Sequence, residues 1–189
     1  MDNLSSLYLA MGRSIANWAH LESELAETLA DLVECDIRHA GIILYSVISF
    51  SAKLEMVDGL FRYEHRDEPD CAYWSDLVGY IRELSGVRNQ IAHRAARPFS
   101  TSPAPSVADA SFNAWLDAMQ WGVTPHEHDH TTKADRQRKR APIMHTADLS
   151  HYAEAFSHAT GLLRNFRLQT DGFSTFSGKW PEQVNRLPK

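Results

Sequence analysis

Apolar residues recur at alternating spacings of three and four in four stretches of the chain, which is the repeat of one face of an α-helix. These stretches cover residues 15–32, 40–61, 73–94 and 146–166. Gly86 lies inside the third stretch, where glycine lowers helix stability by roughly 1 kcal/mol relative to alanine. Its presence suggests the close approach of another helix or a need for local flexibility. Four such stripes with mostly short connections predict an all-α fold, an antiparallel four-helix bundle.

The third stripe contains one charged residue, Arg88. The other positions of the stripe are apolar or small: Trp74, Leu77, Ile81, Leu84, Ile91 and Ala95. A guanidinium keeps its charge in a protein, and on a packed face it is costly unless it finds a partner or a wet cleft. Asn89 and His93 are four positions apart, so we expect them on one helix face beside Arg88. An arginine, an amide and an imidazole at a helix end can together handle a phosphate.

The segment 96–145, between the third and fourth stripes, has a different character. Prolines with Ser and Thr predict an irregular stretch at its start, and an apolar group then suggests a short helix: Phe112, Trp115, Leu116 and Met119. Because a structureless loop of this length is unusual in a compact domain, we expect part of the segment to be ordered. Residues 170–189 form a loop-like tail, whose Phe173, Phe176 and Trp180 we expect to pack along the bundle.

Length and composition indicate one globular domain over residues 1–189. The net charge of −5 excludes a general polyanion binder, so any contact with RNA requires a local basic patch. The chain shows neither a secretory signal nor an apolar run long enough to span a membrane. Cys35 and Cys71 lack metal-ligand spacing and are expected to stay reduced, which favours a cytoplasmic protein. Because no apolar run is long enough to span a membrane, we expect no membrane partner.

Two charged groups inside the 96–145 segment have competing interpretations. His126, His128 and His130 alternate along the chain and could hold zinc from one side of a strand, but a solvated loop is favoured because no second cluster completes a closed site. The basic run at residues 133–140 is either a solvated face or a patch that attracts RNA. In the second interpretation the RNA-binding residues are Arg136, Arg138, Lys139 and Arg140.

Glu22 occupies a core position of the first stripe, where an unpaired carboxylate would be costly. One interpretation is that Leu21 takes the core position and Glu22 pairs at its edge. The alternative is a structural ion pair with Lys53 or with Arg88 that supports the site.

The motif of Arg88 followed by Asn89 and, four positions later, His93 resembles the signature of the HEPN superfamily of small all-helical domains. Residues 18–22 and 49–54 also look like family features of the first two helices, and the resemblance covers about residues 10–95 and 146–168. It implies a HEPN-like bundle, and it makes a short β-hairpin the alternative for the 96–145 insertion, because family members often carry strands there. Many members are metal-independent ribonucleases of toxin, phage-defence or RNA-processing systems.

The resemblance therefore implies an endoribonuclease that needs no cofactor or metal. His93 would transfer a proton, Arg88 would stabilise charge on the phosphorus, and Asn89 would orient the imidazole or the phosphate. In the family two such motifs meet across a two-fold axis, so a homodimer with an RNA substrate is expected. An antitoxin or a nucleotidyltransferase-like protein is a further expected partner.

Two other functions remain open from the sequence. The first is a non-catalytic HEPN-like module that binds a nucleotide or a protein partner. The second, ranked well below it, is a helical enzyme of another kind that uses the histidine cluster and a metal.

Overall fold

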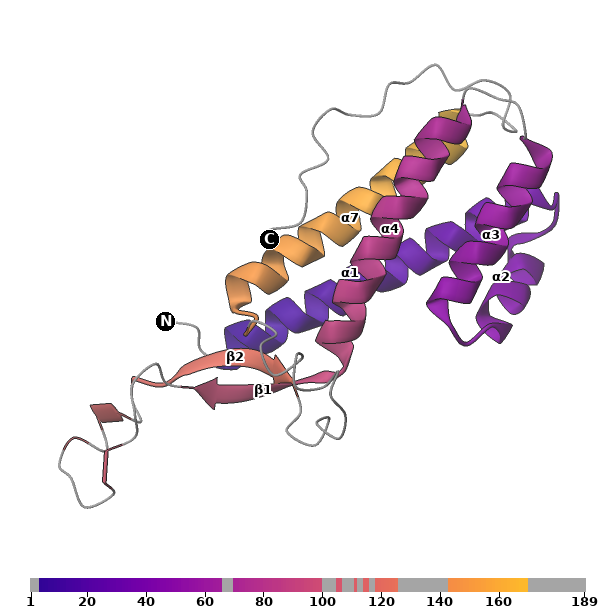
Figure 1. Ribbon diagram of the computed structural model, residues 1–189. Coiled ribbons are helices and arrows are strands. Elements are labelled where there is room, and N and C mark those ends of the chain that lie inside the picture. The colour runs from indigo at the N-terminus through magenta and orange to yellow at the C-terminus, as the bar shows by residue number, and fades with distance from the viewer. Residues whose placement is uncertain are drawn as a thin grey trace, which may run out of the picture. The chain divides into compact units, whose positions relative to one another are not determined.

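The computed structural model describes residues 4–65, 70–99, 105–106, 111, 114–115, 118–125 and 143–169. Within these residues the protein is mostly helical, with a small two-stranded antiparallel sheet (Figure 1). The elements in chain order are α1 (Leu4–Leu32), α2 (Ile37–Ser46), α3 (Phe50–Glu64), α4 (Asp70–Ala92), β1 (Arg94–Phe99), β2 (Gln120–Pro125) and α7 (Thr146–Gln169).

The contacts divide the chain into two compact units. Unit 1 comprises Met1–Ala19 and Gly86–Ser157, and unit 2 comprises His20–Ser85 and His158–Lys189. The helices α1, α4 and α7 contribute residues to both units. A single domain over residues 1–189 stays a prediction.

Unit 2 is built on an aromatic cluster. The ring centroids of Phe61 and Trp74 are 4.5 Å apart, and those of Trp74 and Phe166 are 5.5 Å apart. The Trp74 indole Nε1 donates a hydrogen bond of 2.9 Å to Asp58 Oδ1, so its polar atom is satisfied within the apolar surroundings. This cluster joins α3, α4 and α7, whose stripes were predicted from the sequence.

The second predicted helix is wrong as a single element, because it divides into α2 and α3. Residues 47–49 between them are not helical, and Val47 and Ser49 are both extended, with ψ of 121° and 126°. The side chain of Ile48 is completely exposed. Val47 and Ile48 are β-branched and favour extended backbone. Because the break is three residues long, the apolar residues on either side of it keep a spacing of three to four. The apolar pattern of the sequence therefore continues from α2 into α3.

Unit 1 contains the sheet. β1 pairs antiparallel with β2, with Arg97 opposite Gly122, and Val123 forms a further antiparallel bridge with Met144. The hairpin interpretation of the insertion is therefore confirmed for its strands, and the strand begins at Arg94 rather than at residue 96. A helical turn is also present near Trp115, whose backbone N–H donates to the Ser111 carbonyl at 2.9 Å.

Helix α7 begins at Thr146, within one residue of the start that the sequence indicated. The Asp148 carboxylate accepts the backbone N–H of His145 at 2.8 Å, which satisfies a donor at the helix start. Within unit 1, Ser14 Oγ donates to the Leu149 carbonyl at 2.9 Å and Asn17 Nδ2 donates to the Ala153 carbonyl at 2.8 Å. These bonds hold the first part of α1 against the start of α7.

None of the helices in the described part of the chain combines the length and the apolar character needed to cross a membrane. Three predicted features lie outside the described residues: the histidines at 126, 128 and 130, the basic run with Arg136, Arg138, Lys139 and Arg140, and the tail at 170–189. Phe112 and Leu116 of the predicted short helix also lie outside them.

Candidate functional site

The predicted site lies at the end of α4, in unit 1. Arg88 is half-buried between the buried side chains of Val87 and Ile91 along the chain, whereas Asn89 is exposed. One guanidinium nitrogen, Arg88 Nη1, donates to Asn89 Oδ1 at 3.2 Å. The Nε of Arg88 is buried and has no hydrogen-bond partner among the described residues. A buried donor without a partner is costly, and an anion bound at this place would satisfy it.

His93 occupies the single position between α4 and β1. Its backbone N–H donates to the Asn89 carbonyl at 3.1 Å and closes the last helical turn. Its side chain is exposed. The imidazole is therefore held at a junction of two regular elements, on a defined backbone, and is accessible to a ligand.

Arg94, Gln90 and Tyr152 also belong to this region, and the sequence analysis did not select them. Arg94 Nη2 donates to Gln90 Oε1 at 2.8 Å. Burial lowers the pKa of Arg94, and the neighbouring Tyr152 opposes this effect. Burial raises the pKa of Tyr152, Asp148 raises it further, and Arg94 lowers it. The spacing of four between Gln90 and Arg94 was the sequence signal for their hydrogen bond. The electrostatic effect of Tyr152 on Arg94 had no such signal.

Glu22 and Lys53 form an ion pair in unit 2. Lys53 Nζ lies 3.0 Å from Glu22 Oε2, and their side chains are 9% and 15% exposed. The predicted pair with Lys53 is therefore present, and Leu21 takes the buried position beside it, as the other interpretation expected. The same ammonium lies 4.8 Å from the centre of the Tyr45 ring. A role of this pair in supporting the site stays a prediction.

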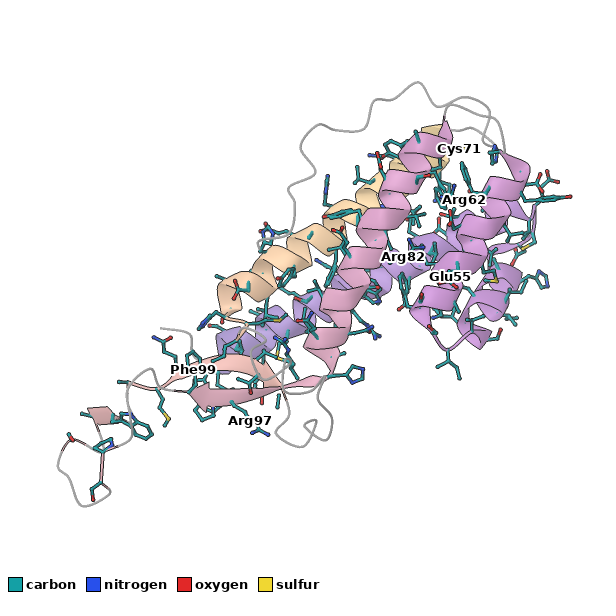
Figure 2. The ribbon with its side chains drawn as sticks, in the orientation of Figure 1. Glu55, Arg62, Cys71, Arg82, Arg97 and Phe99 are labelled. Carbon is teal, nitrogen blue, oxygen red and sulfur yellow. The ribbon has the colours of Figure 1, made fainter. Side chains whose placement is uncertain are left out.

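Unit 2 contains a cavity of about 460 Å³ lined by Gly59, Arg62, Tyr63 and Cys71. Figure 2 labels Arg62 on α3 and Cys71 on α4. Two polar groups of the lining have partners: Arg62 Nε donates to Asp58 at 2.8 Å, and Cys71 Sγ donates to the His65 carbonyl at 2.8 Å. None of the lining residues is among those with a buried side-chain atom that lacks a hydrogen-bond partner in the described part of the chain, whereas Arg88 is.

The described residues contain no group of three or more His, Cys, Asp or Glu side chains placed to hold a metal ion. None of the protein-family models, curated proteins or solved structures compared with this chain matches it. The geometry of the site and the residues of its motif are therefore what supports a function.

Proposed function

We propose that this protein is a metal-independent endoribonuclease whose catalytic residues are Arg88, Asn89 and His93. One observation carries the proposal: a half-buried guanidinium with an unpartnered Nε among the described residues stands on the same helix end as an exposed imidazole. An RNA phosphate offers the anionic oxygens that would satisfy this donor. The likeness of the motif to that of HEPN ribonucleases supports the same chemistry.

The reaction uses the ribose 2′-hydroxyl as an internal nucleophile. His93 accepts the proton of this hydroxyl, and the 2′-oxygen forms a bond to phosphorus while the bond from phosphorus to the 5′-oxygen breaks. The leaving 5′-oxygen takes up a proton. Arg88 stabilises the charge on the phosphorane, and Asn89, which already accepts from Arg88, orients it. The products are a 2′,3′-cyclic phosphate and a 5′-hydroxyl. DNA is not cleaved, because it lacks the 2′-hydroxyl that acts as the nucleophile.

A homodimer solves a geometrical problem of this site. Arg88 and His93 are five positions apart, which in a regular helix is about 500° of rotation and leaves them roughly 140° apart. A two-fold partner supplies a second Arg88 and a second His93, which can converge on one phosphate. Two-fold dimers are the commonest oligomers of soluble proteins.

The test of catalysis is incubation of the purified protein with mixed RNAs in excess EDTA. We expect cleavage that leaves 2′,3′-cyclic phosphate ends, and its loss in Arg88→Ala and His93→Ala. His39→Ala, which removes an exposed histidine of α2, is the matched control and should cleave like the wild type. Loss of wild-type cleavage on chelation, with recovery on adding a divalent cation, contradicts the mechanism.

The test of the composite site is a mixed dimer of Arg88→Ala and His93→Ala subunits. Each variant alone is inactive, but the mixed dimer retains one Arg88 and one His93 on different chains. We expect it to recover part of the activity. An inactive mixed dimer, with dimerisation confirmed by light scattering, contradicts a site built from one residue of each chain.

The proposal extends to a toxin or defence role restrained by an antitoxin or a nucleotidyltransferase-like partner. The basic run with Arg136, Arg138, Lys139 and Arg140 would then attract RNA to the site. The second candidate function is a non-catalytic module that binds a nucleotide or a protein, which the half-buried Arg88 would also serve. A wild type that binds RNA or nucleotides but cleaves no RNA would favour it.

A further inference from the structure

Helix α2 of unit 2 carries an exposed, largely apolar face. Arg38, Gly41, Ile42 and Tyr45 follow one another at spacings of three, one and three, which places them on one side of the helix. These four residues are named the α2 face. Ile42 is 70% exposed and Tyr45 is 54% exposed, and the two residues that α2 buries lie outside this group. A group of exposed large apolar side chains indicates an interaction surface.

More apolar surface adjoins the α2 face. Ile37 and Ile43 are each 45% exposed, and Ile48, which follows the helix, is completely exposed. The helix contains no acidic residue, although the whole chain has a net charge of −5. The centres of protein interfaces are depleted in acidic residues and enriched in aromatic residues and arginine. The α2 face has this composition.

The α2 face has a gap beside its most exposed side chain. A Cβ added at Gly41 would meet only Tyr45 Cδ2, at 4.0 Å, so the space above the glycine is open within the described part of the chain. Ile42 stands next to this gap. Two helices pack when the ridges of one enter the grooves of the other, and a glycine at the crossing lets their backbones approach closely.

The α2 face is complementary to itself across a two-fold axis. In an antiparallel pair of α2 helices centred between Gly41 and Ile42, Gly41 lies opposite the partner's Ile42, and Arg38 lies opposite the partner's Tyr45. A guanidinium can stack on the face of a tyrosine ring. Tyr45 is 54% exposed even though Lys53 Nζ of α3, the neighbouring helix in Figure 1, lies 4.8 Å from the centre of its ring.

Charge favours the antiparallel direction over the parallel one. Arg38 lies in the first turn of α2, at the positive end of the helix dipole, and the last turn contains no basic residue. Antiparallel pairing brings each Arg38 to the negative end of the other helix, whereas parallel pairing would place the two arginines against each other. Within the described residues no hydrogen bond or ion pair engages the Arg38 guanidinium, whose backbone N–H alone donates to Asp36.

We infer that the α2 face binds the same face of a second copy of this chain, with the two α2 helices antiparallel across a two-fold axis. The occupant is a second copy because the face matches itself in shape and in charge. The inference goes beyond the proposed function and does not depend on it, since α2 belongs to unit 2 whereas Arg88 and His93 belong to unit 1. A short helix makes a small interface, so we expect a dissociation constant in roughly the micromolar range.

The test is the molar mass of the full chain, measured by light scattering over concentrations up to about 1 mM. Ile42→Glu brings two carboxylates together at the crossing and should weaken self-association at least roughly tenfold. Leu168→Glu changes a 61% exposed position of α7 and is the matched control, which should associate like the wild type. Circular dichroism confirms that both variants fold. A wild type that stays monomeric, or equal effects of the two variants, overturns the inference.

Gly41→Leu distinguishes specific packing from general adhesion of an apolar surface. The added side chain starts in open space among the described residues, so the fold should be retained. It fills the gap that the partner's Ile42 would occupy, and self-association should weaken roughly tenfold. General adhesion would instead strengthen, because the substitution adds apolar surface. Unchanged or stronger association overturns the inference.

Cysteine crosslinking tests the antiparallel direction. A short bismaleimide should join two Ile42→Cys chains, because the two positions lie beside the axis. Ile37→Cys is the matched control: its two positions are about 12 Å further apart along the antiparallel helices, so it should crosslink poorly. The wild type, which keeps Cys35 and Cys71, gives the baseline. Equal crosslinking of the two variants overturns the arrangement. No readout here uses RNA cleavage, so this inference and the proposed function fail separately.

Discussion

Arg88 should lower the stability of the fold and yet be required for the proposed RNA cleavage. Its Nε is buried with no hydrogen-bond partner among the described residues, and its Nη1 bonds only to the exposed Asn89 within that part of the chain. An unsatisfied buried donor costs about 1–3 kcal/mol.

We therefore predict that Arg88→Met leaves the free energy of unfolding unchanged or raises it by about 1 kcal/mol, because it removes the unsatisfied donor and keeps the apolar stem. RNA cleavage by this variant should be lost. Urea denaturation and the cleavage assay measure the two effects. A variant that is both inactive and strongly destabilised would show that Arg88 is structural.

The ion pair of Glu22 and Lys53 allows a second prediction at this scale. Both side chains are largely buried, and their charged atoms are 3.0 Å apart. Lys53→Met removes the ammonium that lies 3.0 Å from the largely buried Glu22 carboxylate, so the free energy of unfolding should fall by roughly 3 kcal/mol. Urea denaturation measures the change.

The matched control is the double variant Lys53→Met with Glu22→Leu, which removes both charges. It should recover most of the loss, because two apolar side chains can replace a buried pair at little cost. Equal stability of the single variant and the wild type would mean that solvent screens this pair.

At the scale of elements, two glycines have opposite surroundings. An added Cβ at Gly122 of β2 would overlap Ile143 Cγ2 and lie 3.0 Å from Phe99 Cε1. At Gly86 of α4 it would meet no described atom within 4 Å. The expectation that Gly86 marks close helix approach is therefore wrong, and local flexibility remains as its explanation from the sequence.

Alanine at these two positions should consequently shift stability in opposite directions. Gly122→Ala should lower the free energy of unfolding by about 1–3 kcal/mol, because Ile143 must move. Gly86→Ala should raise it by about 0.5–1 kcal/mol, because the helix gains a residue that favours it and nothing is displaced. Thermal unfolding of both variants under one set of conditions gives the comparison. A stabilising Gly122→Ala would contradict the packing of β2 against Ile143.

The elements also differ in how far their sequences predicted them. The third and fourth stripes predicted α4 and α7 closely, because each helix buries one face along its whole length. The stripe over 40–61 covers two helices. The spacing of apolar residues indicates which positions are buried, and it does not reveal a three-residue turn that leaves this spacing unchanged. The strands were left as an alternative, because their pairing joins residues about twenty-five positions apart, beyond any local pattern.

At the scale of the whole molecule, burial of tyrosines makes stability depend on alkaline pH. Burial is the first cause that raises the pKa of Tyr73 and Tyr80 in unit 2 and of Tyr152 in unit 1 above the ordinary value of 10.0. A group whose pKa is higher in the folded state stabilises that state fully below its unfolded pKa. This contribution is lost as the pH rises above that value and through the folded pKa.

We predict that the free energy of unfolding stays level with respect to these groups up to about pH 10 and falls as the pH is raised further. Urea denaturation over a pH series measures the decline. Ultraviolet absorbance of tyrosinate should show that these groups ionise at higher pH in the native protein than in denaturant. Coincident titration curves in the two states would contradict the burial of these side chains.

The amino-acid sequence by itself determined that the chain is mostly helical, where α4 and α7 run, and that Arg88, Asn89 and His93 fall at the C-terminal end of one helix. These properties depend on local spacing, which a sequence displays directly. Only the tertiary structure decided the register of β1 on β2 and the burial of Arg88 Nε without a hydrogen-bond partner among the described residues. These features depend on which distant residues meet and which polar atoms are left without a partner. Both arise from packing in three dimensions, and a pattern along the chain carries no record of them.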